Sequence, residues 1–121
     1  MKLKDTGKQQ QFDTGAQRDA SEGKGRPSLM SPYALDEYSK QLERGAEKYS
    51  ARNWEQGMPL CRIFDSLMRH LWAWMLGDAT EPHLGAIMFN AAALVHGTIM
   101  VRLGLWPKHL DDRPIYRKVK Q

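Results

Sequence analysis

The sequence contains a single cysteine, Cys61, among 121 residues, so no disulfide can form within the chain. It opens without the apolar stretch of a secretory signal, so we expect no signal peptide. Its longest apolar run is interrupted by Asn90 and His96, and we therefore expect no membrane span and no membrane partner. A lone thiol without an export signal is typical of proteins in a reducing compartment, which predicts a cytoplasmic location.

Two kinds of active site are also missing. The sequence has no Gly-x4-Gly-Lys-Ser/Thr run, which excludes a Walker phosphate loop. No histidine stands in a triad-like arrangement with Cys61, so we do not expect nucleophilic catalysis. The formal net charge is +4, from 18 Lys and Arg against 14 Asp and Glu. This excess suits a nucleotide, phosphate or nucleic-acid partner, and a basic soluble protein without such a partner is equally consistent with it.

The spacing of the apolar residues predicts an all-α fold, an antiparallel bundle of three main helices. Residues 1–31 are polar and rich in glycine, and we expect an extended arm there. Residues 32–105 carry three segments with apolar residues every three or four positions, which is the pattern of amphipathic helices. Residues 106–121 predict an irregular basic tail. Three helices make a thin core for a monomer, so we expect oligomerisation, as a homodimer or tetramer, to complete it.

Capping residues predict where the helices begin and end. Ser31 followed by Pro32 predicts the start of the first helix. Gly77 and Gly104 predict the ends of the second and third helices, and Thr80 predicts the N-cap of the third. The expected buried face of that third helix consists of Leu84, Ile87, Met88, Ala91, Leu94, Val95, Ile99 and Met100.

Three carboxylates predict a metal site. Glu43 and Glu47 are four residues apart on the first helix, so they lie one turn apart on one face. Asp65 on the second helix is in a position to face them across the bundle. Hard cations such as Mg²⁺ prefer carboxylate oxygens, which makes these three residues the candidate metal ligands and catalytic residues. A solvated face balanced by neighbouring basic residues is the alternative.

Basic, aromatic and amide side chains predict nucleotide contacts. Glycines beside basic residues in the arm allow the backbone to approach an anion closely, although a flexible basic linker has the same composition. An aromatic ring beside Arg and Asn just past the first helix can stack on a nucleobase. Asn90 stands in an apolar run and must bond a neighbouring helix or a ligand. The expected nucleotide-binding set is Arg18, Lys24, Arg26, Lys48, Arg52, Asn53, Trp54, Arg69, His83 and Asn90.

Five segments occur together and in order: TGAxRD, GKGR, GAEKYSARNWEQG, DSLMRHLWAW and HLGAIMFNAAAL. Over about residues 12–104 this set resembles the phage-encoded family of dATP/dGTP diphosphohydrolase N-terminal domains, which are related to MazG-like all-α nucleoside triphosphate pyrophosphohydrolases. The resemblance implies a helical, oligomeric enzyme that acts on purine dNTPs and releases dNMP and pyrophosphate. It implies Mg²⁺ held by carboxylates on facing helices, with Mn²⁺ as a substitute. A phage-encoded enzyme of this kind would work in the host cytoplasm.

The sequence departs from the wider MazG pattern in two places. That pattern has a Glu-x-x-Glu pair on one helix, whereas Glu43 and Glu47 are four residues apart. In the segment HLGAIMFN, His83 and Ala86 stand where the pattern has carboxylates. Asp65, or Glu81 just ahead of the third helix, would have to supply the missing ligands.

Three functions follow from these observations. The first is a metal-dependent pyrophosphohydrolase of purine dNTPs. The second is a phage protein that binds and sequesters nucleotides without hydrolysis, which the missing carboxylates of the third helix favour. The third is a small basic helical module that binds nucleic acid, supported by the net charge and the basic tail. We rank them in this order, so nucleic acid is the least expected partner.

Overall fold

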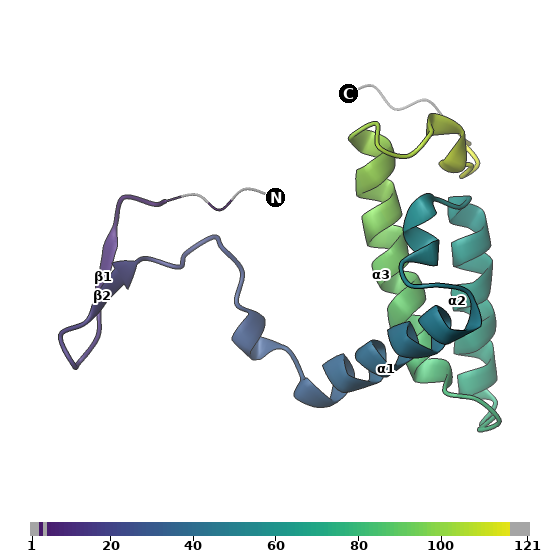
Figure 1. The fold of residues 1–121 in the computed structure, drawn as a ribbon, viewed down its shortest axis with the longest axis horizontal. Coiled ribbons are helices and arrows are strands. Elements are labelled where there is room, and N and C mark those ends of the chain that lie inside the picture. Colours follow the sequence, from purple (N-terminus) through teal and green to yellow (C-terminus); the bar gives the residue numbers. More distant parts are fainter. Residues whose placement is uncertain (1–2, 4, 117–121) are drawn as a thin grey trace. The chain divides into compact units, whose positions relative to one another are not determined.

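The computed structural model describes residues 3 and 5–116. The chain divides into two compact units, Met1–Pro32 and Tyr33–Gln121. The described part is mostly helical with one small sheet (Figure 1), which confirms the all-α expectation. Residues 1, 2 and 4 of the expected arm and residues 117–121 of the expected basic tail lie outside the described residues. The elements in chain order are β1 (Gln9–Gln11), β2 (Gln17–Asp19), η1 (Pro27–Leu29), α1 (Pro32–Lys48), η2 (Asn53–Gln56), α2 (Leu60–Met75), α3 (His83–Arg102) and η3 (Lys108–Leu110).

The first unit contains an antiparallel hairpin that apolar spacing did not indicate. β1 pairs with β2, with Gln9 opposite Asp19. The Asp19 carboxylate accepts hydrogen bonds from the backbone N–H and the hydroxyl of Thr6, both at 2.9 Å. It also forms an ion pair with Lys24, and these contacts hold the pKa of Asp19 well below its usual range. Polar bonds define this hairpin, because its strands consist of Gln, Arg and Asp.

The two predicted glycine caps are confirmed. Gly77 and Gly104 have φ of +81° and +75°, the left-handed conformation that glycine adopts without steric cost. At the end of α2 the Asp78 N–H donates to the Ala73 carbonyl at 3.0 Å. The end of α3 has the same arrangement, and both satisfy carbonyls of the last helical turn.

The predicted cap of α3 is wrong. The helix begins at His83 with Pro82 at its N-cap, and no side-chain hydrogen bond caps it. The Thr80 hydroxyl instead donates to the Asp78 carboxylate at 2.9 Å. The Thr80 hydroxyl therefore bonds to Asp78 and does not cap the helix, and α3 starts three residues beyond Thr80.

The hydrophobic core lies where α2 and α3 pack side by side (Figure 1). Leu60 and Ile63 of α2 are buried against Ala93 of α3. The segment after α3 closes this core through Trp106, which is 4% exposed and donates its indole N–H to the Glu55 carbonyl at 3.0 Å. The residues after α3 are therefore part of the packed domain as far as Leu110.

The buried side of α3 is not the expected one. Leu84 and Val95, both expected inside, are 52% and 63% exposed. A helix that is apolar on nearly all sides gives no spacing signal for the buried face. Its inner side instead carries small residues that let neighbouring segments approach closely, together with two polar side chains. The buried residues of α3 are His83, Gly85, Ala86, Asn90, Ala93 and Gly97.

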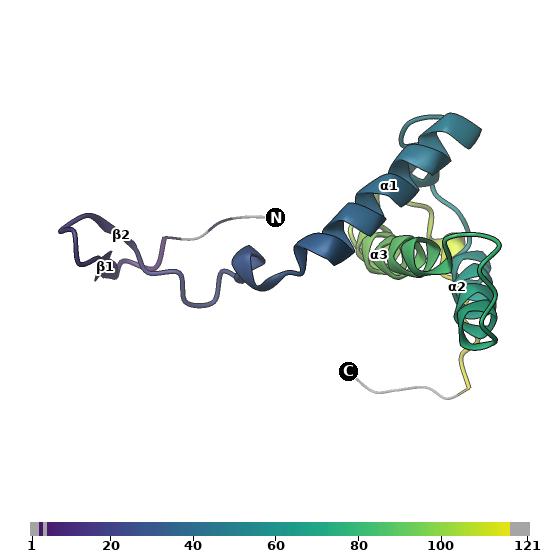
Figure 2. The same ribbon diagram turned by 90° about the horizontal axis from the view of Figure 1, so that it is seen from below.

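Helix α1 lies on one side of the α2–α3 pair (Figure 2). All of α1 is described, and none of its residues is buried. It approaches α3 at Gly85, where an added Cβ would lie 2.9 Å from an Arg44 nitrogen and 3.3 Å from the Glu37 carbonyl oxygen. Glycine at position 85 therefore lets α1 seat against α3.

By length and composition, α3 is a candidate membrane span, the one such helix among the described residues. Asn90 and His96, on which the expectation of no membrane span rested, therefore do not exclude a span by length and composition. One such helix is weak evidence, because core helices of globular proteins also satisfy the measure. In this chain α3 packs along α2 and buries the polar side chains of His83 and Asn90.

Candidate functional site

A groove of about 890 Å³ lies between α1, the η2 turn, and the α2–α3 pair. Helix α1 supplies charged residues to one wall, and α2 and α3 supply polar residues to the opposite wall. Such a concave surface with convergent polar groups is the usual form of a ligand site. The charged, polar and aromatic side chains discussed below that line it are Gln41, Glu43, Arg44, Lys48, Arg52, Asn53, Trp54, Glu55, Arg62, Ser66, His70, Glu81, Phe89 and Asn90.

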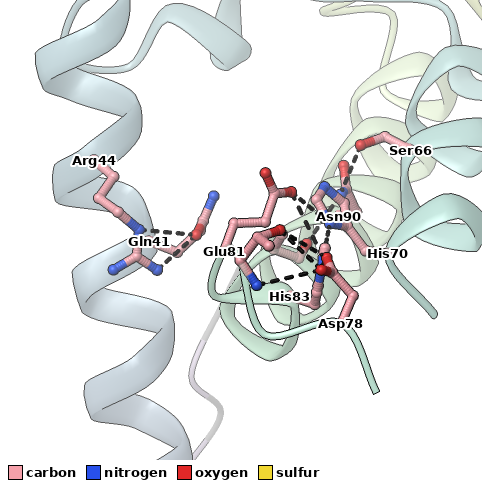
Figure 3. Close-up of polar contacts among 10 residues, drawn as sticks. Gln41, Arg44, Ser66, His70, Asp78, Glu81, His83 and Asn90 are labelled. Atoms are coloured by element: carbon pink, nitrogen blue, oxygen red, sulfur yellow. Dashed lines mark hydrogen bonds and ion pairs between the residues drawn. The ribbon is translucent and has the colours of Figure 1, made fainter. Parts of the chain in front are cut away.

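Three ligand-type side chains meet at one end of the groove, close to the α2–α3 turn (Figure 3). His70 comes from α2, Glu81 from the connecting loop, and His83 is the first residue of α3. The two Nδ1 atoms of His70 and His83 are 2.8 Å apart. The Glu81 Oε1 atom lies 3.4 Å from Nδ1 of His70 and 3.6 Å from Nδ1 of His83. In residues 3 and 5–116 this is the one group of three whose ligand atoms lie within 4.8 Å of one another.

Asp78 fixes the orientation of His83. The Asp78 carboxylate contacts Nε2 of His83 and accepts a hydrogen bond from the Thr80 hydroxyl. These two contacts, the first one above all, lower the pKa of Asp78. An ionised carboxylate only accepts, so this network assigns the proton of neutral His83 to Nε2. Nδ1 of His83 then offers a lone pair to the interior of the cluster.

This cluster has two chemical uses. Without a ligand, the Nδ1–H of His70 donates to the bare Nδ1 of His83, and the imidazole pair is satisfied. With a cation, the same Nδ1 atoms and the Glu81 carboxylate are positioned to serve as ligands. His83 is only 6% exposed, so the protein fixes one ligand rigidly and leaves Glu81 accessible.

Asn90 joins α3 to α2 at the groove. Its amide nitrogen donates to the Ser66 hydroxyl at 3.2 Å and to the Ala86 carbonyl at 2.9 Å. The buried amide therefore finds a partner on a neighbouring helix, one of the two alternatives that its position predicted. Within the described residues, no buried side-chain nitrogen or oxygen lacks a hydrogen-bond partner.

Positive charge lines the groove from several elements. Arg44 of α1 is held in place by its Nε and Nη2 atoms, which donate to the Gln41 side-chain oxygen at 3.2 and 2.7 Å. Lys48 and Arg62 line the groove from α1 and α2 and are exposed. Arg52 also lines it and forms an ion pair with Glu55 at 2.6 Å. A polyanion in this groove would meet cations from both sides.

Trp54 connects the groove to the core. Its ring packs edge-on against Phe89 and His96, with centroid distances of 5.7 and 4.9 Å. It is half-buried and lines the groove beside Asn53. One part of the indole is thus fixed by packing, and the ring reaches a place where a planar ligand could stack.

The structure brings only part of the expected site together. Glu47, Asp65 and Arg69 are described and exposed, but they are not among the residues that line the groove. The pKa of Cys61 is raised above all by its hydrogen bond with Asp112, and the charge of Asp65 nearby adds to this effect. The expected residues Glu43, Lys48, Arg52, Asn53, Trp54 and Asn90 line the groove, His83 lies behind its wall, and Arg18, Lys24 and Arg26 belong to the first unit.

Sequence reasoning gave no role to His70 or Asp78. His70 is less than two helical turns before the glycine cap of α2, and His83 begins α3. In a helical hairpin with a short connection, the end of one helix lies beside the start of the next. That topology, together with histidine at both places, is the signal that could have found the cluster.

Residues 14–102 match the model of a protein family described as dATP/dGTP diphosphohydrolase, N-terminal. The matched range includes every groove residue named above and the whole His70–Glu81–His83 cluster. Neither a curated protein nor a solved structure matches the chain.

Proposed function

The chain belongs to the dATP/dGTP diphosphohydrolase N-terminal family, and from this premise we propose that it hydrolyses purine dNTPs to dNMP and pyrophosphate with the help of a divalent metal. The observation that supports this proposal is the groove, where cationic side chains, the carboxylates of Glu43, Glu55 and Glu81, and aromatic rings line one space. A nucleoside triphosphate is complementary to this lining. Its phosphates are a polyanion that suits the cations and can share a hard metal ion with a carboxylate, and its planar base suits an aromatic ring.

The cations have a defined task in such a reaction. Hydrolysis between the α- and β-phosphates develops charge on the phosphoryl oxygens and on the leaving pyrophosphate. Fixed positive groups stabilise that charge most when their position needs no reorganisation. Arg44, held by Gln41, meets this requirement best, and Lys48 and Arg62 add charge around it.

Glu43 is the carboxylate that we propose as a metal ligand. Mg²⁺ commonly binds one or two carboxylates together with substrate phosphates, and Glu43 lines the groove. When bound, the ion would polarise the phosphoryl group and supply an activated water. Glu47 and Asp65 complete the expected set of ligands only where a second chain or a bound nucleotide brings them to the groove.

The base and sugar would lie toward Trp54. Its half-buried ring offers a stacking surface that packing against Phe89 holds in place. Asn53 beside it and Asn90 on the opposite wall provide amide groups for hydrogen bonds with a base or sugar.

The test uses the purified full chain with each of the four dNTPs in the presence of Mg²⁺ or Mn²⁺. Monophosphate and pyrophosphate are quantified, and we expect turnover of dATP or dGTP above that of dCTP and dTTP. The variant Glu43→Gln should lose activity with its helical circular dichroism intact, whereas Glu47→Gln is the matched carboxylate one turn away. An equal loss of activity in both variants would mean that Glu47 is also a metal ligand. Absence of turnover with any dNTP would overturn the proposal.

A nucleotide-sequestering protein is the second candidate. Ala86 lines the groove at a position where MazG-like enzymes are expected to have a carboxylate, and its side chain has no ligand atom. A protein of this kind would bind dATP or dGTP in the presence of EDTA and release no product. Calorimetry with EDTA separates it from the enzyme.

We also propose that the chain forms a homo-oligomer in the cytoplasm. Large apolar side chains of α2 and α3, among them Trp72, Met75 and Val95, are exposed in the single chain. Trp72 and Met75 are three residues apart on α2 and so share one face of that helix, and exposed apolar surface of this kind favours association. Sedimentation equilibrium would show a dimer or tetramer, and a monomer at micromolar concentration would refute this part.

A further inference from the structure

The three ligand atoms of the His70–Glu81–His83 cluster form a triangle of a particular size. Its sides are 2.8, 3.4 and 3.6 Å, which gives a circumscribed radius of about 1.9 Å. A point about 2.0–2.1 Å from all three atoms therefore exists just off the plane of the triangle, and this is the length of zinc–nitrogen and zinc–carboxylate bonds. Tetrahedral zinc ligands at this bond length lie about 3.3–3.4 Å apart, so the two sides to Glu81 are close to the separations of a bound ion, and the 2.8 Å side between the imidazoles must open slightly.

The second observation is the contact between Asp78 and Nε2 of His83. A metal-binding histidine usually donates its other ring N–H to a carboxylate, which fixes the ring and makes the ligand atom more basic. Asp78 does this for His83, and the Thr80 hydroxyl in turn bonds to Asp78. The hydrogen bonds thus leave the electron pair of His83 Nδ1 facing Nδ1 of His70, and a bound ion would replace the hydrogen bond between them, with the proton of His70 on Nε2.

The third observation is the kind of donor. Two imidazole nitrogens and one carboxylate are a set that suits zinc and other transition metals, whereas Mg²⁺ prefers oxygen ligands. We therefore propose that His70, Glu81 and His83 form a transition-metal site, oriented by Asp78 and selective for ions such as Zn²⁺, Co²⁺ and Mn²⁺ over Mg²⁺. It is distinct from the oxygen-ligand position of Glu43.

The site would communicate with the groove. His70 and Glu81 both line the groove, and the Glu81 side chain is 56% exposed, so an ion can enter from that side. Three protein ligands leave further coordination positions for water or a phosphate oxygen. Contact with a nucleotide depends on the function proposed above, whereas binding of the ion itself does not.

The experiment is a titration of the metal alone. Untagged full-length protein is stripped with a chelator and titrated by calorimetry with Zn²⁺, Co²⁺, Mn²⁺ and Mg²⁺ in the absence of nucleotide. We expect one transition-metal ion per chain, a visible absorption spectrum for the Co²⁺ form, and Mg²⁺ affinity at least about 100-fold lower than that for Zn²⁺.

Variants then test the assignment. His70→Ala, Glu81→Gln and His83→Ala should abolish or strongly weaken binding of Zn²⁺ and change the Co²⁺ spectrum. Asp78→Asn should weaken binding by about 10–100-fold, because it removes the orienting charge. His109→Ala, at an exposed histidine of η3, is the matched control and should bind like the wild type. Because His83 is buried and its variant can unfold, the exposed Glu81 provides the decisive substitution.

Three outcomes would overturn the site: no bound transition metal, wild-type affinity in Glu81→Gln and His70→Ala, or equal affinities for Mg²⁺ and Zn²⁺. The dNTP assay is separate. Turnover with Mg²⁺ and no binding of Zn²⁺ would remove this site and leave the proposed function intact. Tight Zn²⁺ binding without turnover of any dNTP would support this site and overturn the proposed function.

Discussion

Arg44 of α1 lies directly against Gly85 of α3, so that a Cβ at position 85 would be 2.9 Å from the Nη2 atom of Arg44. The Gln41 side-chain oxygen, which holds Arg44, would be 3.3 Å from the same Cβ. The glycine on one helix thus determines where the guanidinium of the other helix lies in the groove.

The variant Gly85→Ala should displace Arg44 without unfolding the domain. We expect dATP or dGTP to bind about tenfold more weakly, since one hydrogen bond with a charged group contributes about 1.5 kcal/mol. Gly45→Ala is the control for stability: no described atom outside the helix lies within 4 Å of its added Cβ, and it should stabilise α1 by about 0.5–1 kcal/mol. Calorimetry and urea unfolding measure the two effects. If Gly85→Ala binds dATP and dGTP with unchanged affinity, Arg44 does not contribute to nucleotide binding.

Gly97→Ala should destabilise the core. An added Cβ would lie 2.6 Å from the Trp106 ring and 2.8 Å from a Leu60 methyl carbon, and both side chains are buried. Overpacking of this kind costs about 1–3 kcal/mol in the free energy of unfolding. Urea denaturation followed by Trp fluorescence measures it. A wild-type midpoint would mean that Trp106 can move away from α3.

Two arginines on α2 form a matched pair for nucleotide binding. Arg62 lines the groove, whereas Arg69 is exposed on the described surface and does not line it. Arg62→Gln should weaken the binding of dATP or dGTP by about tenfold through loss of one charged contact, and Arg69→Gln should have no effect. Equal losses in the two variants would indicate a diffuse effect of net charge, which raised salt concentration would also suppress.

Asp112 caps α2 from a distance in the sequence. Its Oδ1 accepts the Cys61 N–H at 2.9 Å, and this bond is the main cause that lowers the pKa of Asp112. A carboxyl whose pKa is lower in the folded than in the unfolded state stabilises the fold above its unfolded pKa. That stability is lost as the pH falls through the folded pKa, here below about pH 4.

Two variants test this cap. Asp112→Ala should lower the midpoint of thermal unfolding at pH 7 by about 4 °C, as expected for a lost helix cap. Asp112→Asn retains the acceptor and should keep most of the stability at pH 7, but lose less of it as the pH falls below about 4 than the wild type does. Parallel acid profiles for the wild type and Asp112→Asn would contradict the assignment.

The helices were predictable because their signals are local. Ser31-Pro32 stands where α1 begins, and Gly77 and Gly104 stand where α2 and α3 end, each through backbone chemistry that acts within a few residues. The hairpin around Asp19 gave no such signal, because its bonds join polar side chains that spacing does not distinguish from a loop. The inner face of α3 was equally hidden, because apolar residues occur on nearly all sides of the helix and its buried side carries the polar side chains of His83 and Asn90.

The candidate site was predictable only in part. Glu43, Trp54 and Asn90 line one groove, as their residue types suggested, because each lies in or next to a segment that apolar spacing correctly identified as helical or as a break between helices. Asp65 does not line that groove although its neighbour Ser66 does, since one position along a helix turns a side chain by about 100°. His70 and Asp78 become part of a site only because the turn between α2 and α3 brings residues 70, 78 and 83 together. A spacing pattern within one helix carries no information about such a contact.

The contrast between an unburied α1 and the packed α2–α3 pair has a consequence for local opening. Segments with little buried surface detach at lower free energy than the core, so amide hydrogens of α1 should exchange with solvent while those near Leu60 and Ala93 stay protected. The wall of the groove that α1 forms is then the part of the second unit that opens locally at the lowest free energy. A nucleotide that bridges both walls would slow exchange in α1 more than anywhere else in that unit, and the strength of binding would include the cost of holding this helix still.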